Sequence, residues 1–523
     1  MSRGAGGGTA ARGIAVGTSK TSYDAVVVGS GACGGWAAKQ LTEAGLRVLV
    51  LEAGRSDRSD RMLWVWHRLR QKLLRYRTEQ DARRKARQAV QSTTFAWPFH
   101  PHAFVDDVDN PYTTPDGQPF TWIRARQVGG RTSVKAHGRQ FYRLSDFNFK
   151  AGSRDGQGPD WPLTLAELAP HYETVEKWMG LRGNADGLDT LPDSVFASSI
   201  ALTPAEQRLK ERVERRWAER RVVVRRTADA PVTLPAAMKT GRLTLRSHAV
   251  VDQVLYDAKT GRATGVHYID AETGKSYEAH ARVVVVAAST IESTRLLLNS
   301  RSSAFPDGLG NSSGQLGRNL MDHTYLLGLE GKMNLPAEAQ RAEQSWAYIP
   351  QFRNVGTKEA SFARGYGVQV FTFGDSCHFV PFGEMVPRPE NRVTLSPTTK
   401  DRWGIPVAHI ECKHSDNELK MSADAVASCQ EMMTEAGFTV EKVNDTLSTP
   451  GMAIHEVGTA RMGTDPKTSV LNPFNQSWDV PNLYVTDGSC FPSQGPQNPT
   501  LTMMALTVRA CAHLVGELKA GRL

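Results

Sequence analysis

The spacing of apolar positions near the start of the chain changes twice over a short distance. Residues 24–28 (DAVVV) are a short β-branched apolar run, which predicts a buried strand. The amphipathic run over 32–44 predicts a helix, and the apolar run over 48–51 predicts a second strand that stops at Glu52. This succession of strand, helix and strand is typical of one unit of an α/β sheet.

Three glycines lie between the first strand and the helix with the spacing G-x-G-x-x-G. Gly29 allows a sharp turn, Gly31 allows the backbone to approach a pyrophosphate, and Gly34 allows helix and strand to pack closely. The helix N-terminus offers N–H groups to phosphates, and Glu52 is placed to accept hydrogen bonds from a ribose. The unit predicts a dinucleotide site, with NAD and FAD both open. Three adjoining residues are assigned to the same site, namely Ala32, Cys33 and Ala53.

The nucleotide-type pattern returns in the middle of the chain. Residues 243–254 and 263–270 alternate as strands, and the continuous β-branched run over 281–288 (ARVVVVAA) predicts a central strand buried on both faces. A helix over 291–298 is expected to follow it. Since a long insertion interrupts the pattern, we expect the first domain to be discontinuous in sequence.

A second domain is expected because 523 residues exceed what one compact core normally holds. Strand-like stretches alternate with turns over 326–444 and include 391–396 and 406–413. This pattern predicts one antiparallel sheet, covered by a helix over 417–435.

Composition narrows the class of protein. The net charge is +9, but there is no zinc-finger spacing and no RNA-binding aromatic motif, so we expect no nucleic-acid partner. The six scattered cysteines include no C-x-x-C pair, which argues against a metal site or a disulfide framework and favours buried thiols. We expect no transmembrane segment. Residues 1–22 lack a continuous apolar core, so we expect a disordered tail rather than a secretory signal, and a cytoplasmic location.

Residues 55–91 are dense in Arg and Lys, with Trp and Leu interleaved at helical spacing. We interpret this basic stretch as a solvated amphipathic helix that lies over the domain. A docking surface for a protein partner is the alternative.

Six motifs along the chain resemble, in the same order, those of the glucose–methanol–choline (GMC) flavoprotein oxidoreductases. After the opening unit they read GGRTSV, VVVVAAST, GRNLMDH, HEVGTARMG, VTDGS and QNPTLT. The resemblance spans about residues 22–515. The segments YTTPDGQPFTWIRARQVGGR and HEVGTARMGTDPKTSVLN are most similar to bacterial FAD-dependent sugar dehydrogenases, especially glucoside 3-dehydrogenase catalytic subunits.

The resemblance implies FAD rather than NAD at the glycine loop, and it implies a catalytic pair. His455 matches the family histidine, and Asn498 fills a second position that relatives occupy with His or Asn. A base that titrates near neutrality suits removal of a hydroxyl proton, while an amide N–H suits the developing alkoxide. We expect three other histidines to be structural, namely His323, His409 and His414.

Further cofactor contacts are expected around the glycine pair at 129–130, which offers a backbone approach to the flavin edge, and near the C-terminus. Val251 is expected to contact adenine through its backbone. The remaining predicted contacts are Arg126, Gly129, Gly130, Thr132, Ser133, Ala288, Asp487, Gly488, Asn498, Pro499 and Thr500. Some relatives attach flavin covalently to a histidine in this loop. Here Ser133 occupies one aligned position and His137 lies a few residues later, so we expect non-covalent FAD.

The resemblance predicts an α/β fold, with an FAD-binding Rossmann-like domain (doubly wound, three layers) and an inserted substrate domain built on an antiparallel sheet covered by helices. The FAD-binding parts are 23–160, 238–325 and 445–523, and the substrate parts are 161–237 and 326–444.

The predicted reaction is oxidation of a secondary hydroxyl of a sugar or glycoside, at C3, to the ketone. Expected partners are a small subunit and a separate haem electron acceptor. Co-export with a signal-bearing small subunit would make the location periplasmic. The alternatives are a pyranose-oxidase-like enzyme that uses O₂, a GMC dehydrogenase for non-sugar alcohols, and a flavin-bearing assembly subunit.

Overall fold

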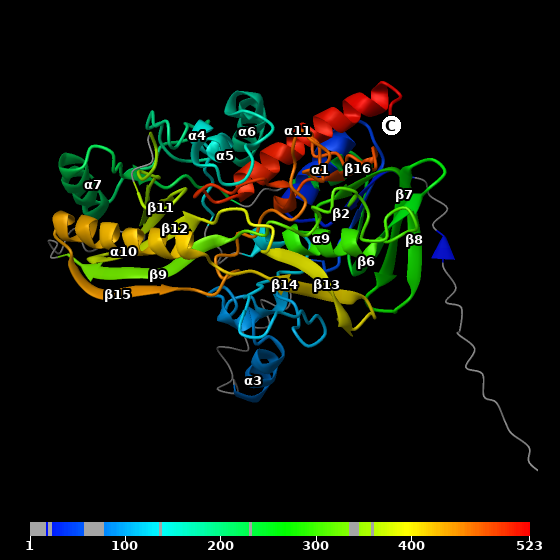
Figure 1. Cartoon of the computed structure of the whole chain (residues 1–523), viewed down its shortest axis with the longest axis horizontal. Helices are drawn as coiled ribbons and strands as arrows, with labels where there is room; N and C mark the ends of the chain where they lie inside the picture. Colours follow the sequence, from blue (N-terminus) through cyan, green and yellow to red (C-terminus); the bar gives the residue numbers. More distant parts are fainter. Residues whose placement is uncertain are drawn as a thin grey trace, which may run out of the picture.

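In the residues that it describes, the computed structural model of the chain contains two large β-sheets and a smaller one (Figure 1). Apart from residues 17 and 18, the predicted tail lies outside the described residues, and so do residues 57–77 of the basic stretch. The rest of that stretch includes the helix α3 (Thr78–Arg87). The structure describes residues 17–18, 23–56, 78–134, 139–229, 233–333, 345–356 and 360–523.

The larger sheet has eight strands in the order β5–β3–β2–β8–β7–β6, with β1 and β16 also paired to β8. The pairs among β5, β3, β2, β8, β1 and β16 are parallel, whereas β6 and β7 join as antiparallel strands. Segments from the start, middle and end of the chain therefore share one sheet. Its strands are β1 (Gly17–Thr18), β2 (Tyr23–Val28), β3 (Val48–Leu51), β5 (Leu243–Arg246), β6 (Ala249–Asp257), β7 (Arg262–Asp270), β8 (Ser276–Val286) and β16 (Leu483–Val485).

Helices from distant parts of the chain cover the parallel strands. The helix α1 (Ala32–Glu43) packs against α8 (Thr233–Lys239). It also packs against α11 (Thr500–Lys519), which in turn packs against α6 (Leu165–Met179) (Figure 1). Among the described helices, α11 alone is long and apolar enough to cross a membrane. However, 61% of the apolar stretch of this helix is buried inside the fold, and core helices have the same length and apolar composition.

The second sheet has the order β15–β9–β12–β11–β10–β4, and its pairs are antiparallel. One face packs on α7 (Pro204–Arg216) and α10 (Asp416–Ala436), which confirms the predicted helix over 417–435. The other face borders the cavity described below. The strands are β4 (Val223–Val224), β9 (His323–Lys332), β10 (Ser345–Ile349), β11 (Tyr366–Phe373), β12 (Ser376–Glu384) and β15 (Thr439–Leu447).

Two strand predictions were wrong in detail. The run 243–254 divides at His248, whose φ is 57°, because β5 pairs with β3 whereas β6 turns away to pair with β7. The stretches near 391–396 and 406–413 form a separate two-stranded sheet, β13 (Arg392–Lys400) and β14 (Pro406–Glu411). This sheet packs on α9 (Thr290–Asn299), since its buried apolar residues belong to the same core as those of that helix.

The other described elements are short. They are α4 (Asp146–Phe149), α5 (Ala151–Asp155), and the 3₁₀ turns η1 (Gln91–Thr93), η2 (Pro101–Ala103), η3 (Arg131–Ser133) and η5 (Gly488–Cys490).

Candidate active site

A cavity of about 1040 Å³ is lined by residues of both large sheets. The carboxyl ends of β2, β3 and β8 open into it, which is where open α/β sheets bind ligands. Its volume lies at the upper end of the range for small-molecule sites. Gly34, Gly129 and Ser133 do not line it. The predicted site residues that do are Gly29, Gly31, Ala32, Cys33, Glu52, Ala53, Arg126, Gly130, Thr132, Val251, Ala288, His455, Asp487, Gly488, Asn498, Pro499 and Thr500.

Two glycines of the first loop, Gly29 and Gly34, and Gly130 of the second are required by close backbone contacts. Gly29 has a φ of +95°, and a methyl group there would lie 2.4 Å from the carbonyl oxygen of Ala287. A methyl group on Gly130 would lie 2.9 Å from the Cα of Gly31, so the two glycine loops touch. At Gly34 the corresponding distance to the carbonyl oxygen of Gly29 is 2.0 Å. Gly34 therefore acts through helix packing, as its place in the motif predicts.

Glu52 joins the two glycine loops at the end of β3. One carboxylate oxygen accepts hydrogen bonds from the N–H and the hydroxyl of Ser30, at 3.1 and 2.6 Å, and the other accepts one from the N–H of Gly54 at 2.8 Å. Burial raises the pKa of this carboxyl, while the hydrogen bonds oppose the rise. The Ser30 hydroxyl also accepts the N–H of Gly129 at 3.1 Å. Gly129 thus supports the site from behind instead of lining it.

Asp487 joins the ends of β16 and β8. Its carboxylate accepts hydrogen bonds from the N–H and hydroxyl of Ser489, at 3.0 and 2.6 Å, and from the hydroxyl of Ser293. Ser293, in α9, accepts in turn the N–H of Ala288 at 3.0 Å. Burial raises the pKa of Asp487. These bonds hold the two strand ends, and with them the backbone of Gly488, in one fixed arrangement at the cavity.

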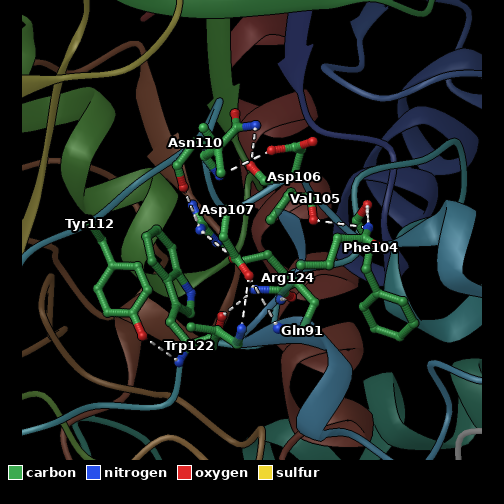
Figure 2. Close-up of polar contacts among 12 residues, drawn as sticks. Gln91, Phe104, Val105, Asp106, Asp107, Asn110, Tyr112, Trp122 and Arg124 are labelled. Carbon is green, nitrogen blue, oxygen red and sulfur yellow. Dashed lines mark hydrogen bonds and ion pairs between the residues drawn. The ribbon is translucent and has the colours of Figure 1, made fainter. Parts of the chain in front are cut away.

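Two arginines reach the cavity from the segment that precedes Gly129. Arg126 donates to the side chain of Asn110 at 2.5 Å and pairs with Glu292 at 3.0 Å. Figure 2 shows the neighbouring cluster, in which the N–H of Arg124 donates to Gln91 at 2.7 Å and its guanidinium donates to the carbonyl of Asn110 at 2.6 Å. Burial lowers the pKa of Arg124 to about 10. Arg126 therefore lines the cavity with its charge already balanced by Glu292.

The loop after the glycine pair positions its own residues. The Ser133 hydroxyl donates to the carbonyl of Gly130 at 2.7 Å and accepts from the side chain of Gln127 at 2.6 Å. This explains why Ser133 does not line the cavity, whereas Thr132 does. His137 lies outside the described residues.

His455 and Asn498 meet at the part of the cavity that the second sheet borders. The Nδ2 of Asn498 lies 3.2 Å from the Nε2 of His455, and its Oδ1 accepts a hydrogen bond from the Nε2 of Gln369 at 3.2 Å. Asn498 stands immediately before Pro499, the N-cap of α11, which makes no side-chain cap bond. The two predicted catalytic side chains, distant in sequence, are therefore brought together in the cavity.

A second histidine lies behind His455. The Nδ1 of His323 is 2.8 Å from the Nδ1 of His455, and its Nε2 is 2.7 Å from the carbonyl oxygen of Gly495. His323 is 2% exposed, and burial lowers its pKa to about 4. We expected this residue to be only structural. No local pattern shows the contact, because His323 and His455 are 132 residues apart.

Asp322 holds the loop that carries His455. Its carboxylate accepts the N–H groups of Gly451, Ala453 and His455, at 2.8, 3.2 and 2.9 Å. Burial, with a smaller contribution from Glu456, raises its pKa to about 7. Three backbone groups are thus satisfied by one side chain at the base of the site.

The second sheet contributes a wall that the sequence analysis did not identify. Gln369, Phe371 and Phe373 line the cavity at alternate positions of β11, whereas Val368 and Val370 face the core under α10. This period of two was a readable signal. From β10, Trp346 also lines the cavity, and its buried Nε1 has no hydrogen-bond partner among the described residues.

The described residues show neither a disulfide nor a metal-binding group at the site. All six cysteines are free and buried, and burial raises the pKa of Cys33 to about 12. Within the described ranges, no group of three His, Cys, Asp or Glu side chains is arranged to hold a metal ion.

Two family models, both described as GMC oxidoreductase, match this chain over residues 213–325 and 387–507. The chain belongs to the GMC oxidoreductase family. The second model covers Asp487 and the pair of His455 and Asn498, which are the residues that meet in the cavity.

Full-length and partial relatives agree with this assignment. The chain is 29% identical to 2-methyl-1,2-propanediol dehydrogenase from Mycolicibacterium austroafricanum, over 94% of this chain and 95% of that protein. It is 28% identical to the fructose dehydrogenase large subunit of Gluconobacter japonicus, over 96% and 99%. C-glycoside 3-oxidase from Arthrobacter globiformis is 29% identical over 53% of this chain and 54% of that protein.

The fold is also that of solved flavoenzymes. Pyridoxine 4-oxidase from Mesorbium loti superposes with a TM-score of 0.63, at 18% identity, over 94% of this chain and 98% of that one. The family models and the sequence relatives make the protein an FAD-dependent enzyme that acts on CH–OH groups. The cavity fits the cofactor, since a side chain on Gly130 would meet the backbone of Gly31, and Glu52 stands at the strand end.

Proposed function

We propose that this enzyme oxidises a secondary hydroxyl of a sugar or glycoside, at C3, to the ketone. The observation that carries the proposal is the convergence of His455 Nε2 and Asn498 Nδ2, 3.2 Å apart, at the cavity wall. A hydroxyl oxygen bound between them meets a base on one side and an amide donor on the other.

Each side chain has a distinct part in this reaction. His455 Nε2 accepts the hydroxyl proton, a step in which a positioned base typically contributes 10²–10⁴-fold in rate, roughly. Asn498 has no basic nitrogen, so it donates its Nδ2–H to the same oxygen and stabilises the charge that develops there. When bound, FAD supplies the acceptor for the hydride of the carbinol carbon.

The cavity wall and the relatives support a sugar substrate. Trp346 and Phe371 offer apolar faces for the C–H groups of a pyranose. The fructose dehydrogenase large subunit and C-glycoside 3-oxidase are named for sugar chemistry. A second candidate is a non-sugar alcohol, favoured by the match to 2-methyl-1,2-propanediol dehydrogenase over 94% of the chain.

The electron acceptor is proposed to be a protein rather than NAD or O₂. The name of the fructose dehydrogenase large subunit supports an assembly with a smaller subunit. We propose a separate haem protein as the electron acceptor. The competing possibility, an oxidase, is supported by the name of C-glycoside 3-oxidase. Release of hydrogen peroxide during turnover in air, at the rate of substrate consumption, would show that O₂ is the acceptor.

FAD is proposed to be bound without a covalent link, because Ser133 stands at one aligned attachment position. Acid precipitation of the purified protein should release the yellow colour into the supernatant. Colour that stays in the washed pellet would disprove this part of the proposal.

The test of the reaction is anaerobic bleaching of the flavin absorbance by a panel of alcohols. The panel contains methyl glucoside, a C-glycoside, D-fructose and 2-methyl-1,2-propanediol, and the position of the new ketone is read by NMR. We expect bleaching by a glycoside and a carbonyl at C3. Bleaching by the diol alone would replace the sugar with the second candidate.

Three variants test the roles of the side chains. His455→Ala should slow bleaching by about 10²–10⁴-fold, and Asn498→Ala should also slow it while FAD stays bound. The matched control is His409→Leu, which removes another histidine hydrogen bond, to Thr113 at 2.8 Å, outside the cavity. If His455→Ala bleached as fast as the control, the catalytic assignment would fail and an assembly role would gain support.

A further inference from the structure

His323 and His455 share a hydrogen bond between two like atoms. Their Nδ1 atoms are 2.8 Å apart. One proton between the rings explains this distance, because two bare nitrogens or two N–H groups would repel each other. One ring therefore donates and the other accepts. The choice determines which nitrogen of His455 carries its proton.

The backbone carbonyl of Gly495 settles the direction of that bond. It lies 2.7 Å from the Nε2 of His323 and can only accept, so this nitrogen carries a hydrogen. His323 is 2% exposed, and burial disfavours a second proton on the ring. Its Nδ1 is then bare. The hydrogen between the two rings belongs to His455.

We propose that His323 is a positioning residue that fixes the tautomer of His455, an inference that rests on the proposed role of His455 as the base. By accepting the Nδ1–H of His455, His323 keeps the Nε2 of His455 bare where it faces Asn498 and the cavity. In the other tautomer Nε2 would carry a hydrogen and could not take a hydroxyl proton. The third member of a catalytic triad orients its histidine in the same way.

The direction set at Gly495 continues beyond His455. The bare Nε2 accepts from Asn498, whose Oδ1 accepts from Gln369, whose Oε1 accepts from the amide of Gln140 at 2.6 Å. A row of side-chain amides by itself reads equally well in either direction, since each can exchange its oxygen and nitrogen. The backbone carbonyl of Gly495 can only accept a hydrogen bond, so it fixes one direction for the whole row. It therefore also decides that Asn498 presents an N–H, and not an oxygen, to the substrate.

The direct test is NMR of the FAD-bound full chain labelled with ¹⁵N-histidine. Long-range proton–nitrogen correlations distinguish a ring N–H from a bare ring nitrogen, and loss of signals in His455→Asn and His323→Asn assigns them. We expect His455 to carry hydrogen on Nδ1 and His323 on Nε2. In His323→Leu, His455 should shift to the Nε2–H tautomer or to a mixture. Hydrogen on Nε2 of His455 in the wild type, or no change in His323→Leu, would overturn the inference.

A kinetic test uses two substitutions of His323 that have a similar shape but differ in whether they offer a hydrogen-bond acceptor. The amide oxygen of His323→Asn lies near the position of Nδ1 and can still accept, whereas His323→Leu offers no acceptor. With the panel alcohol that bleaches the flavin fastest, we expect His323→Leu to slow anaerobic reduction about 10²-fold, with half-saturation little changed. His323→Asn should recover at least about tenfold of that loss. Equal rates for the two variants would contradict the inference.

A folding defect is separated from lost positioning by FAD content and by a third variant. His323→Gln places its amide near Nε2, so it keeps a donor for the Gly495 carbonyl but no acceptor for His455. It should behave like His323→Leu even when it retains full FAD. Full activity of His323→Gln would refute the inference. Because NMR reports the tautomer without turnover, failure of the proposed reaction and failure of this inference give different results.

Discussion

Replacing Gly34 with alanine tests whether the first glycine loop is held by backbone contact. The added methyl carbon would lie 2.0 Å from the carbonyl oxygen of Gly29 and 2.8 Å from its carbonyl carbon. Real Cβ atoms essentially never approach closer than 3.0 Å, so α1 and the preceding turn must separate by about 1 Å. Both neighbours are backbone atoms, so no side chain can rotate out of the way.

The magnitude follows from this overlap. Inserting a methyl group into a well-packed contact typically costs about 1–3 kcal/mol. The same displacement moves the helix N-terminus and Gly29 relative to the phosphates, so FAD binding should weaken at least about tenfold, or roughly 1.4 kcal/mol. The matched control is Gly516→Ala in α11, where a methyl group meets nothing within 4 Å. It should stabilise the protein by about 0.5–1 kcal/mol, because glycine is a poor helix former.

The assay compares the unfolding midpoints of the two variants in denaturant and titrates each deflavinated protein with FAD. The midpoints should move in opposite directions, and only Gly34→Ala should lose FAD affinity. If both midpoints moved in the same direction, or if Gly34→Ala bound FAD like the wild type, the packing explanation would be wrong.

Three further predictions concern buried polar groups. Burial lowers the pKa of His323 from 6.5 to about 4, so only the unfolded chain binds this proton between these pH values. Stability should fall by up to about 3 kcal/mol as pH drops through that window, and His323→Leu should lose this dependence in pH-resolved thermal melts. Asp322→Ala leaves the three N–H groups of the His455 loop without their acceptor, and the free energy of unfolding in denaturant should fall by about 3 kcal/mol or more. An unchanged free energy of unfolding would contradict this role. The guanidinium of Arg143 donates two hydrogen bonds to the carboxylate of Glu176, at 2.7 and 2.6 Å, and both side chains are buried. Glu176→Gln leaves Arg143 without its charged partner and should lower the free energy of unfolding by about 3–5 kcal/mol, which the double variant Glu176→Leu with Arg143→Met should largely recover. Equal melting of the single and double variants would refute this.

The local parts of the dinucleotide site could be predicted because they depend on near neighbours in the chain. Gly29 sits in a turn that requires positive φ, and Glu52 directly follows a four-residue strand whose residues are all buried. The run over 281–288 reads as a buried strand because β-branched residues without polar interruption suit a strand covered on both faces. Residues 283–286 are fully buried, as that pattern predicts.

Side-chain partners and sheet membership depended on the tertiary structure. The strands near 391–396 and 406–413 have the same alternation as those of the second sheet, and only their packing on α9 shows that they belong elsewhere. Gly129 belongs to a motif, but in the structure its N–H donates to the hydroxyl of Ser30 and it does not line the cavity.

The active site shows the division most clearly. The types and order of His455 and Asn498 indicated a base and a hydrogen-bond donor, because the chemistry of those groups is intrinsic to the residues. Their separation, the contact of His455 with His323, and the carbonyl of Gly495 that orients the row come from chain segments that meet only in the folded protein. Sequence alone determined which groups are available for the reaction. The tertiary structure decided which atom of each group faces the cavity, since a hydrogen bond depends on distance and direction between segments that no local pattern encodes.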